Sequence, residues 1–225
     1  MTPYARTIFA NNEYYHLFNR GADRRRIFNS VYDYQKAMLT LQYYQHSKLP
    51  IRLSQFLLTN YEQRVHLMTD INNSEKLVEI IAFCLMPNHF HLILRQNINN
   101  GISKFMSQFS NSYTKYFNLK NEHQGKIFQG VFKDVRIESD GQLLHLSRYI
   151  HLNPVVSNII KAEKIKEYRW SSMSEYANNA AENDLCNKQI ILDQFKSRGA
   201  YLKFIVDYVD MARDIHKIKH LCLEE

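Results

Sequence analysis

His89 and His91 stand two positions apart in the apolar segment HFHLILR. Because side chains alternate across a β-strand, a strand here directs both imidazoles to one face and Phe90, Leu92 and Leu94 to the other. Two imidazoles on one face can chelate one metal ion and leave positions open for a substrate. Chance alone produces about 0.4 such pairs in a chain with this histidine content. The apolar context strengthens the interpretation, since buried imidazoles need polar partners.

Well-known metal sites that contain an HxH pair need further residues that are missing here. Metallo-hydrolases of the HxHxDH type carry Asp and His directly after the pair, where this chain has Ile93 and Leu94. Amidohydrolase barrels require eight βα units, for which the chain is too short. Two-histidine phosphoesterases require a pair of HxT/S motifs, which does not occur.

A second group of polar side chains recurs at helical spacing around the segment RYIHLNPV. Tyr149 and Asn153 are four residues apart, and Gln142 and His145 continue the same stripe of a helix. Such a stripe is ordinarily a solvated helix face. It also offers a phenol, which is one of the side chains that form covalent intermediates in catalysis.

Hydrophobic periodicity predicts the elements that must position these residues. We expect strands at 14–19, 78–86, 89–95 and 128–137, a hairpin turn at Pro87-Asn88, and helices at 30–47, 101–118 and 141–152, the last capped by Asp140. Residues 48–76 are ambiguous, because 53–58 fits a strand or a short helix. The order strand, helix, hairpin, helix, strand, helix predicts an α+β fold with helices flanking a largely antiparallel sheet.

The rest of the chain shows no repeat, no linker and little change of composition. We expect residues 155–225 to be mostly helical. The domain prediction is a catalytic core at 1–177 with a helical C-terminal extension of the same domain at 178–225, a size that suits one domain.

The composition is basic and aromatic. Lys and Arg outnumber Asp and Glu by 29 to 22, and 13% of the residues are aromatic. Basic side chains neutralise phosphates and rings stack on bases, so a nucleic-acid partner is favoured, although a solvated basic face explains the same pattern. The predicted DNA-binding residues are Arg20, Arg24, Arg25, Arg26, Lys104, Lys115, Lys133 and Arg136.

Cysteine usage and hydropathy indicate the compartment. Cys84, Cys186 and Cys222 lie far apart, which argues against a disulfide framework or a zinc ribbon and favours a reducing environment. No apolar run approaches the roughly 20 residues needed to cross a bilayer, and the N-terminal residues lack the long apolar stretch of a signal peptide. We therefore expect a soluble, cytoplasmic protein with no membrane partner.

Four segments, YYHLFNRGADRRRIF, LMPNHFHLIL, GKIFQGVFKDV and RYIHLNPV, occur in this order and are followed by YRWSSMSEY. Together they resemble the single-tyrosine HUH transposases, and among these the REP-associated tyrosine transposases, over residues 10–177. The resemblance implies a ferredoxin- or RRM-like HUH core. It also implies a transposase-like endonuclease and strand transferase that cleaves and rejoins single-stranded DNA near hairpins.

The same resemblance implies roles for individual residues. His89 and His91 match the HUH histidines, which bind a divalent metal, Mg²⁺ or Mn²⁺. Tyr149 matches the nucleophile that forms a covalent 5′-phosphotyrosine and leaves a 3′-hydroxyl. Asn153 matches the polar metal ligand one turn later, where relatives often carry the longer Gln. Two imidazoles and an amide prefer transition ions to Mg²⁺.

Several alternatives stay open at this point. Tyr113 and Tyr116 are rival nucleophiles, although their place in an aromatic stripe at helical spacing favours a core role. The chain could be a catalytically inactive, domesticated protein that binds DNA hairpins, or a metal-dependent RNA nuclease on a similar sheet. A homodimer in which Tyr149 serves the histidines of a second copy is also compatible with the sequence.

Overall fold

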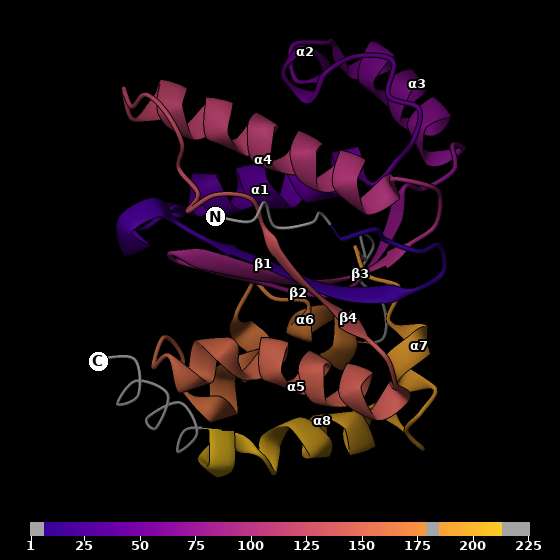
Figure 1. Cartoon of the computed structure of the whole chain (residues 1–225), viewed down its shortest axis with the longest axis vertical. Helices are drawn as coiled ribbons and strands as arrows, with labels where there is room; N and C mark the ends of the chain where they lie inside the picture. The colour runs from indigo at the N-terminus through magenta and orange to yellow at the C-terminus, as the bar shows by residue number, and fades with distance from the viewer. Residues whose placement is uncertain (1–6, 179–184, 213–225) are drawn as a thin grey trace.

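A single four-stranded antiparallel sheet lies at the centre of the computed structural model, which describes residues 7–178 and 185–212. Its strands, in the order β2-β3-β1-β4, are β1 (Tyr14–Arg20), β2 (Val78–Met86), β3 (His89–Gln96) and β4 (Lys133–Ile137). Helices α1 (Val31–Tyr44) and α4 (Gly101–Lys120) cover one face (Figure 1). Helix α5 (Asp140–Val156) and the elements that follow it cover the other face.

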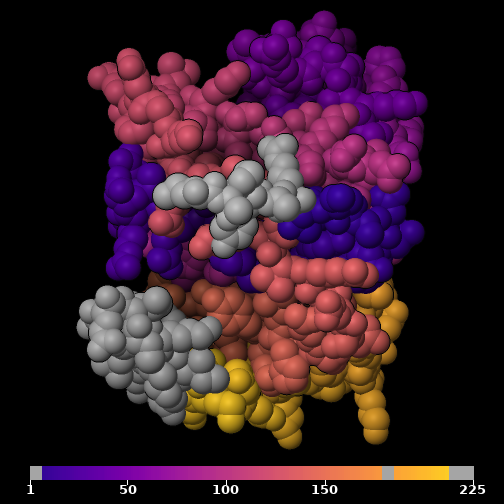
Figure 2. Space-filling model, viewed as in Figure 1, coloured from indigo at the N-terminus to yellow at the C-terminus, as the bar shows by residue number. Residues whose placement is uncertain are grey.

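This architecture confirms the predicted α+β class. The chain order β1-α1-β2-β3-α4-β4 is that of a ferredoxin-like fold. The predicted hairpin is also confirmed, with Pro87 and Asn88 as its two-residue connection. Figure 2 shows the two helical layers as separate bands of the surface, purple and pink on one side and orange and yellow on the other.

The last strand is shorter than predicted. It begins at Lys133 rather than at Phe128. Gly130 has a φ of +141°, a conformation that side-chain-bearing residues rarely adopt and that interrupts an extended strand. Phe128 instead forms an isolated bridge to Gly21 and is buried on the α4 side of the sheet, against Phe90 and Tyr113.

The helix after β4 is longer than the predicted 141–152. It runs from Asp140 to Val156 and passes through Pro154, whose ring removes one main-chain hydrogen bond. Ser139, rather than the predicted Asp140, is its cap, since the serine hydroxyl accepts a main-chain N–H of the first turn at 3.2 Å. The extra turn brings the region around Pro154 under the sheet.

The ambiguous segment 48–76 contains two helices, α2 (Leu53–Phe56) and α3 (Tyr61–Asn72). Helix α3 buries only Ile71, so its sequence has no stripe of apolar residues at helical spacing that would predict it. Its signal is the cap, because the Asn60 side chain accepts the main-chain N–H of Gln63 at 2.9 Å.

Short helices make up the C-terminal part. They are η2 (Ala162–Glu167), α6 (Met173–Ala177), α7 (Gln189–Leu192) and α8 (Arg198–Val206), while 179–184 and 213–225 of the predicted helical region lie outside the described residues. Apolar side chains from this part join the main core: Leu185, Ile191, Leu192, Tyr201, Ile205 and Val209. We propose that the core and its C-terminal extension form one domain.

The C-terminal part also covers the β2 edge of the sheet. The main-chain N–H of Leu85 donates to the carbonyl of Trp170, and that of Asn187 donates to the carbonyl of Ile80, both at 2.8 Å. The Tyr168 hydroxyl adds a bond to the Leu85 carbonyl at 2.8 Å. These contacts satisfy main-chain groups that an open edge strand would expose.

Helix α5 is pinned to its surroundings by a buried polar chain. The two ring nitrogens of His151 lie 2.8 Å from the Ser172 hydroxyl and 2.8 Å from the Tyr201 hydroxyl, and His151 is fully buried. Tyr201 on α8 also donates to the Ser147 hydroxyl at 3.2 Å. Because buried polar groups lose stability when they lose partners, this chain fixes the rotation of α5 against the sheet.

No described helix is long and apolar enough to span a membrane. Among the described residues, Cys84 and Cys186 are both buried and form no disulfide, whereas Cys222 lies outside them. Burial raises the pKa of the Cys84 thiol, which makes it the inert core residue that its apolar context predicts.

A buried carboxylate joins α1 to α4 on the other side of the sheet. Asp33 caps α1 by accepting the main-chain N–H groups of Asn29 and Ser30, and it accepts further bonds from Lys120 at 2.6 Å and Tyr116 at 2.9 Å. Burial alone would raise the pKa of Asp33. The hydrogen bonds, led by that of Lys120, outweigh burial and hold this pKa below its ordinary value.

Replacement Asp33→Asn tests this connection between α1 and α4. A carboxyl whose pKa is lowered by folding stabilises the protein above its unfolded pKa, and that stability is lost as the pH falls through the folded value. We expect the variant to lose about 1–3 kcal/mol at pH 7, and to show a flatter loss of stability below pH ~4 than the wild type. Urea unfolding at several pH values measures both. Parallel pH curves for the two proteins would contradict the assignment.

Candidate active site

The two histidines of β3 lie on the face of the sheet that α5 covers. Register pairs His91 with Phe18 and His89 with Arg20 on β1. Strand alternation directs both imidazoles to this face, with ring centroids 5.1 Å apart. Phe90, between them, points to the opposite face and packs edge-on against Phe109 of α4.

A cavity of about 470 Å³ opens at this face. It collects six of the residues singled out in the sequence: Arg20, His89, His91, Lys133, Tyr149 and Asn153. The remaining lining residues are Phe18, Asn19, Phe90, Gln129, Val131 and Ser157. Side chains from β1, β3, the segment before β4 and α5 thus meet at one place.

Tyr149 projects from α5 and packs against His91. Its ring centroid lies 5.5 Å from that of His91 in an edge-to-face arrangement, and 42% of the residue is exposed. Asn153, one turn further along α5, is buried, and its amide nitrogen donates to the Tyr149 carbonyl at 3.1 Å. The tyrosine is therefore accessible, while the asparagine is held beneath it.

His16 is a site residue to which the sequence patterns assigned no role. Its Nε2 lies 2.9 Å from Nδ1 of His91, and the two rings stack with centroids 5.1 Å apart. Like His91, it is buried. The alternation in YYHLFN puts His16 on the same face as Phe18, and this was the one signal in the sequence. Only the pairing of β1 with β3 brings it to His91.

Two histidines of this site, His16 and His91, are uncharged at neutral pH. Burial lowers the pKa of His16 to about 4. Burial also lowers the pKa of His91 well below its ordinary value, and electrostatic interactions with His16, His89 and Arg20 lower it further. Neutral imidazoles keep the lone pair that a metal ligand needs.

The donor set fits a divalent metal that keeps positions open for other ligands. Nδ1 of His89 lies 2.6 Å from the Asn88 side-chain oxygen, and Nδ1 of His91 faces His16. Metal-binding histidines typically use their second nitrogen in this way. Within 7–178 and 185–212, no cluster of three or more His, Cys, Asp or Glu side chains could hold a metal. The available donors are two imidazoles and the Asn153 amide.

The other predicted DNA-binding residues lie away from the cavity. Arg25 contacts His123 at 2.7 Å, and Arg136 forms an ion pair with Glu13 at 3.1 Å. Arg24, at the end of the short helix η1 (Ala22–Arg24), and Arg26, just after it, are exposed, and Lys104 and Lys115 are exposed on α4, across the sheet from the histidines. Only Arg20 and Lys133 of the eight reach the cavity.

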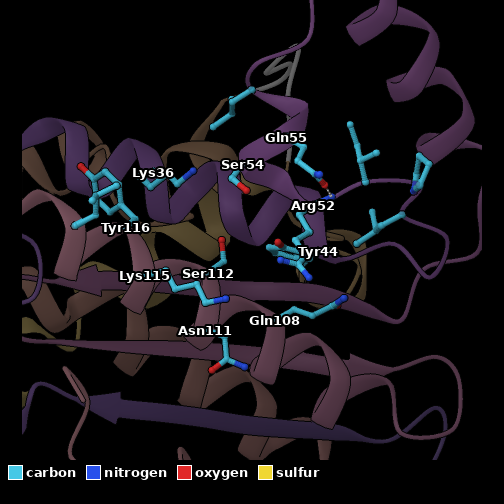
Figure 3. Close-up of a pocket in the computed structure, with 15 residues that line it drawn as sticks. Lys36, Tyr44, Arg52, Ser54, Gln55, Gln108, Asn111, Ser112, Lys115 and Tyr116 are labelled. Atoms are coloured by element: carbon cyan, nitrogen blue, oxygen red, sulfur yellow. Dashed lines mark hydrogen bonds between the residues drawn. The ribbon is translucent and has the colours of Figure 1, made fainter. Parts of the chain in front are cut away.

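A larger cavity, of about 810 Å³, lies between α1, α2 and α4 (Figure 3). Lys36, Arg52 and Lys115 give it a positive lining, but no histidine or carboxylate lines it. It is on the side of the sheet opposite α5. The larger space therefore lacks the imidazoles that the smaller one gathers.

The rival tyrosines have structural partners on that same far side. The buried Tyr113 hydroxyl donates to the Ile27 carbonyl at 2.6 Å, and burial raises its pKa. Tyr116 donates to Asp33, as described above. Both lie on α4, across the sheet from the histidines.

Comparison with known proteins adds an independent observation. Residues 10–153, more than half of the chain, match the protein family described as "Transposase IS200 like". A search of curated proteins found no match. A solved structure of a REP-associated tyrosine transposase bound to a REP hairpin is similar, with 16% identity, 78% of this chain and 84% of that chain covered, and a TM-score of 0.48. The family match extends over β1, both histidines and the Tyr149 helix, and the chain belongs to the IS200-like transposase family.

Proposed function

We propose that this transposase is a metal-dependent endonuclease and strand transferase that cleaves and rejoins single-stranded DNA through Tyr149. The observation that carries the proposal is the accessible Tyr149 ring lying against His91, in a cavity that also contains His89 and Asn153. The resemblance to REP-associated tyrosine transposases makes DNA beside a hairpin the proposed substrate.

Binding would begin with the phosphate backbone. Arg20 and Lys133 flank the cavity and attract a phosphodiester, whose charge would otherwise repel a nucleophile. Phe18 and Val131 supply apolar lining on which the sugar and base can rest. The strand would then present one phosphate to the tyrosine.

In the chemical step, the Tyr149 oxygen attacks phosphorus. A tyrosine O–P bond forms and the P–O3′ bond breaks, so that the 5′ phosphate becomes covalently attached. The phenol loses its proton, and the departing 3′ oxygen gains one. A divalent metal, Mg²⁺ or Mn²⁺, held by His89, His91 and Asn153, would withdraw charge from the phosphate and fix its orientation. Attack by a 3′-hydroxyl on the phosphotyrosine reverses the step and rejoins DNA without ATP.

We also propose that the tyrosine acts within its own chain. Tyr149 and His91 of one chain are in ring contact, and α5 is fixed in that position by the buried His151 chain. A second copy is not needed to complete the cavity.

Replacement Tyr149→Phe should abolish the covalent protein–DNA adduct while leaving hairpin binding intact, because only the nucleophilic oxygen is lost. Hairpin-bearing single-stranded DNA with Mg²⁺ or Mn²⁺, followed by denaturing electrophoresis, detects the adduct. Tyr61→Phe, at an exposed position of α3, is the matched control and should behave as the wild type.

An adduct formed by Tyr149→Phe would show that another residue is the nucleophile. Wild-type protein that binds hairpins tightly but forms no adduct with any divalent metal would establish the inactive hairpin-binding alternative instead. Cleavage of RNA in preference to DNA of equal sequence would favour the alternative of a metal-dependent RNA nuclease.

Mixing two inactive variants tests whether the tyrosine acts in its own chain. A chain with His91→Ala keeps the tyrosine, and a chain with Tyr149→Phe keeps the histidines. We expect no recovery of the adduct in the mixture, because each chain lacks half of its own site. Recovery of about a quarter of the wild-type adduct in an equal mixture would mean that the tyrosine of one copy reaches the histidines of another, because half of the dimers would then be mixed and each would have one complete site.

Replacement Lys133→Ala should weaken binding of single-stranded DNA and lower the slope of log Kd against log salt by about one. The reason is the loss of one phosphate contact at the cavity. Fluorescence anisotropy at several salt concentrations measures the slope. Lys104→Ala, on the far side of the sheet, is the control, and an equal effect of the two substitutions would contradict a phosphate path through the cavity.

A further inference from the structure

His16 and His91 form a hydrogen bond between two buried imidazoles. The nitrogens involved are Nε2 of His16 and Nδ1 of His91, 2.9 Å apart. A single proton occupies such a bond, since two N–H groups cannot face each other and two lone pairs do not bond. The proton belongs either to His91 or to His16, and the choice fixes the tautomer of both rings.

The two arrangements differ in what His91 offers to the cavity. With the proton on Nδ1 of His91, the Nε2 of that ring carries a lone pair and can bind a metal. With the proton on His16, a neutral His91 must carry its own proton on Nε2 and cannot use that nitrogen as a ligand. The hydrogen-bond partner of Nδ1 therefore decides whether His91 can bind a metal through Nε2.

We propose that His16 is a positioning residue that accepts the Nδ1 proton of His91 and so holds His91 as a metal ligand through Nε2. This inference rests on the proposed metal-dependent function. His89 has the matching arrangement, because its Nδ1 faces the Asn88 side-chain oxygen at 2.6 Å. With both Nδ1 atoms occupied, both candidate ligands would use Nε2 toward the same cavity.

The place of His16 in the sheet makes it a rigid acceptor. Its main chain lies between β3 and β4, opposite Ile93 on one side and Val135 on the other. Its ring stacks on Phe18 with centroids 4.9 Å apart and on His91 at an interplanar angle of 19°. A metal ligand oriented by a fixed partner does not have to be ordered when the metal binds, which favours binding.

The tautomer of His91 can be measured directly in the metal-free protein. Long-range ¹H–¹⁵N correlation spectra of histidine-labelled protein distinguish a protonated ring nitrogen from one with a lone pair, and the His91 signals are identified by their loss in His91→Gln. We expect Nδ1 of His91 to be protonated. A protonated Nε2 on His91 would overturn the proposal without any variant of His16.

Two substitutions of His16 separate positioning from packing. His16→Phe retains ring stacking but removes the acceptor, and we expect Mn²⁺ affinity to fall by about 10–100-fold, with His91 shifting to a mixture of tautomers. His16→Gln retains an acceptor oxygen and should restore affinity to within about threefold of the wild type. His66→Phe, an exposed histidine on α3, is the control.

Wild-type Mn²⁺ affinity in His16→Phe, measured by electron paramagnetic resonance, would show that His16 only packs. Absence of Mn²⁺ and Mg²⁺ binding by the wild type would instead refute the proposed metal-dependent function. The tautomer measurement still decides the role of His16 in that case, and also if His16→Phe fails to fold.

Discussion

Pairing of β1 with β3 in one register decides which side chains reach α5. Phe18 lies opposite His91, and Leu17 lies opposite Leu92 on the other face. Since side chains alternate with a period of two, a shift by one residue would replace His16 at the site by Leu17. Leu17 and Leu92 are fully buried, so the α1–α4 side of the core opposes that shift. Apolar packing on one face thereby sets polar geometry on the other.

Helix α5 has to be held as firmly as the strands, because it carries two of the cavity residues, Tyr149 and Asn153. The C-terminal part does this through Tyr201 and Ser172, which contact His151 from α8 and from the segment before α6. Arg148 of α5 adds a cation–π contact, because its guanidinium group lies 3.7 Å from the ring centroid of Tyr208. Elements that contribute no residue to the cavity therefore fix the side that carries the tyrosine.

Elements with strong apolar patterns could be predicted from the sequence, and elements stabilised by other means could not. The hairpin of β2 and β3 is almost wholly buried, so its pattern is unambiguous. Helix α3 buries one side chain and depends on its cap, which a periodicity argument does not detect. The start of β4 depends on the conformation of Gly130, and no hydrophobic pattern encodes a single positive φ.

The grouping of site residues shows the same division. That His89 and His91 share a face follows from a local rule, since they lie two apart on one strand. The meeting of these histidines with Tyr149 was available only through family resemblance, because it requires the packing of α5 on the sheet. The contact of His16 with His91 needed the register of strands that are distant in sequence, which no local pattern contains.

The positions of these residues along the chain also fix when the site can come into being during synthesis. His16 is made early, the β3 histidines follow much later, and α5 is completed only near residue 156. A growing chain that has released β1, α1 and the hairpin has its histidines but no tyrosine beside them. Domains fold as units as they emerge from the ribosome. A chain that ends before α5 consequently has the histidines of the site without Tyr149, the proposed nucleophile.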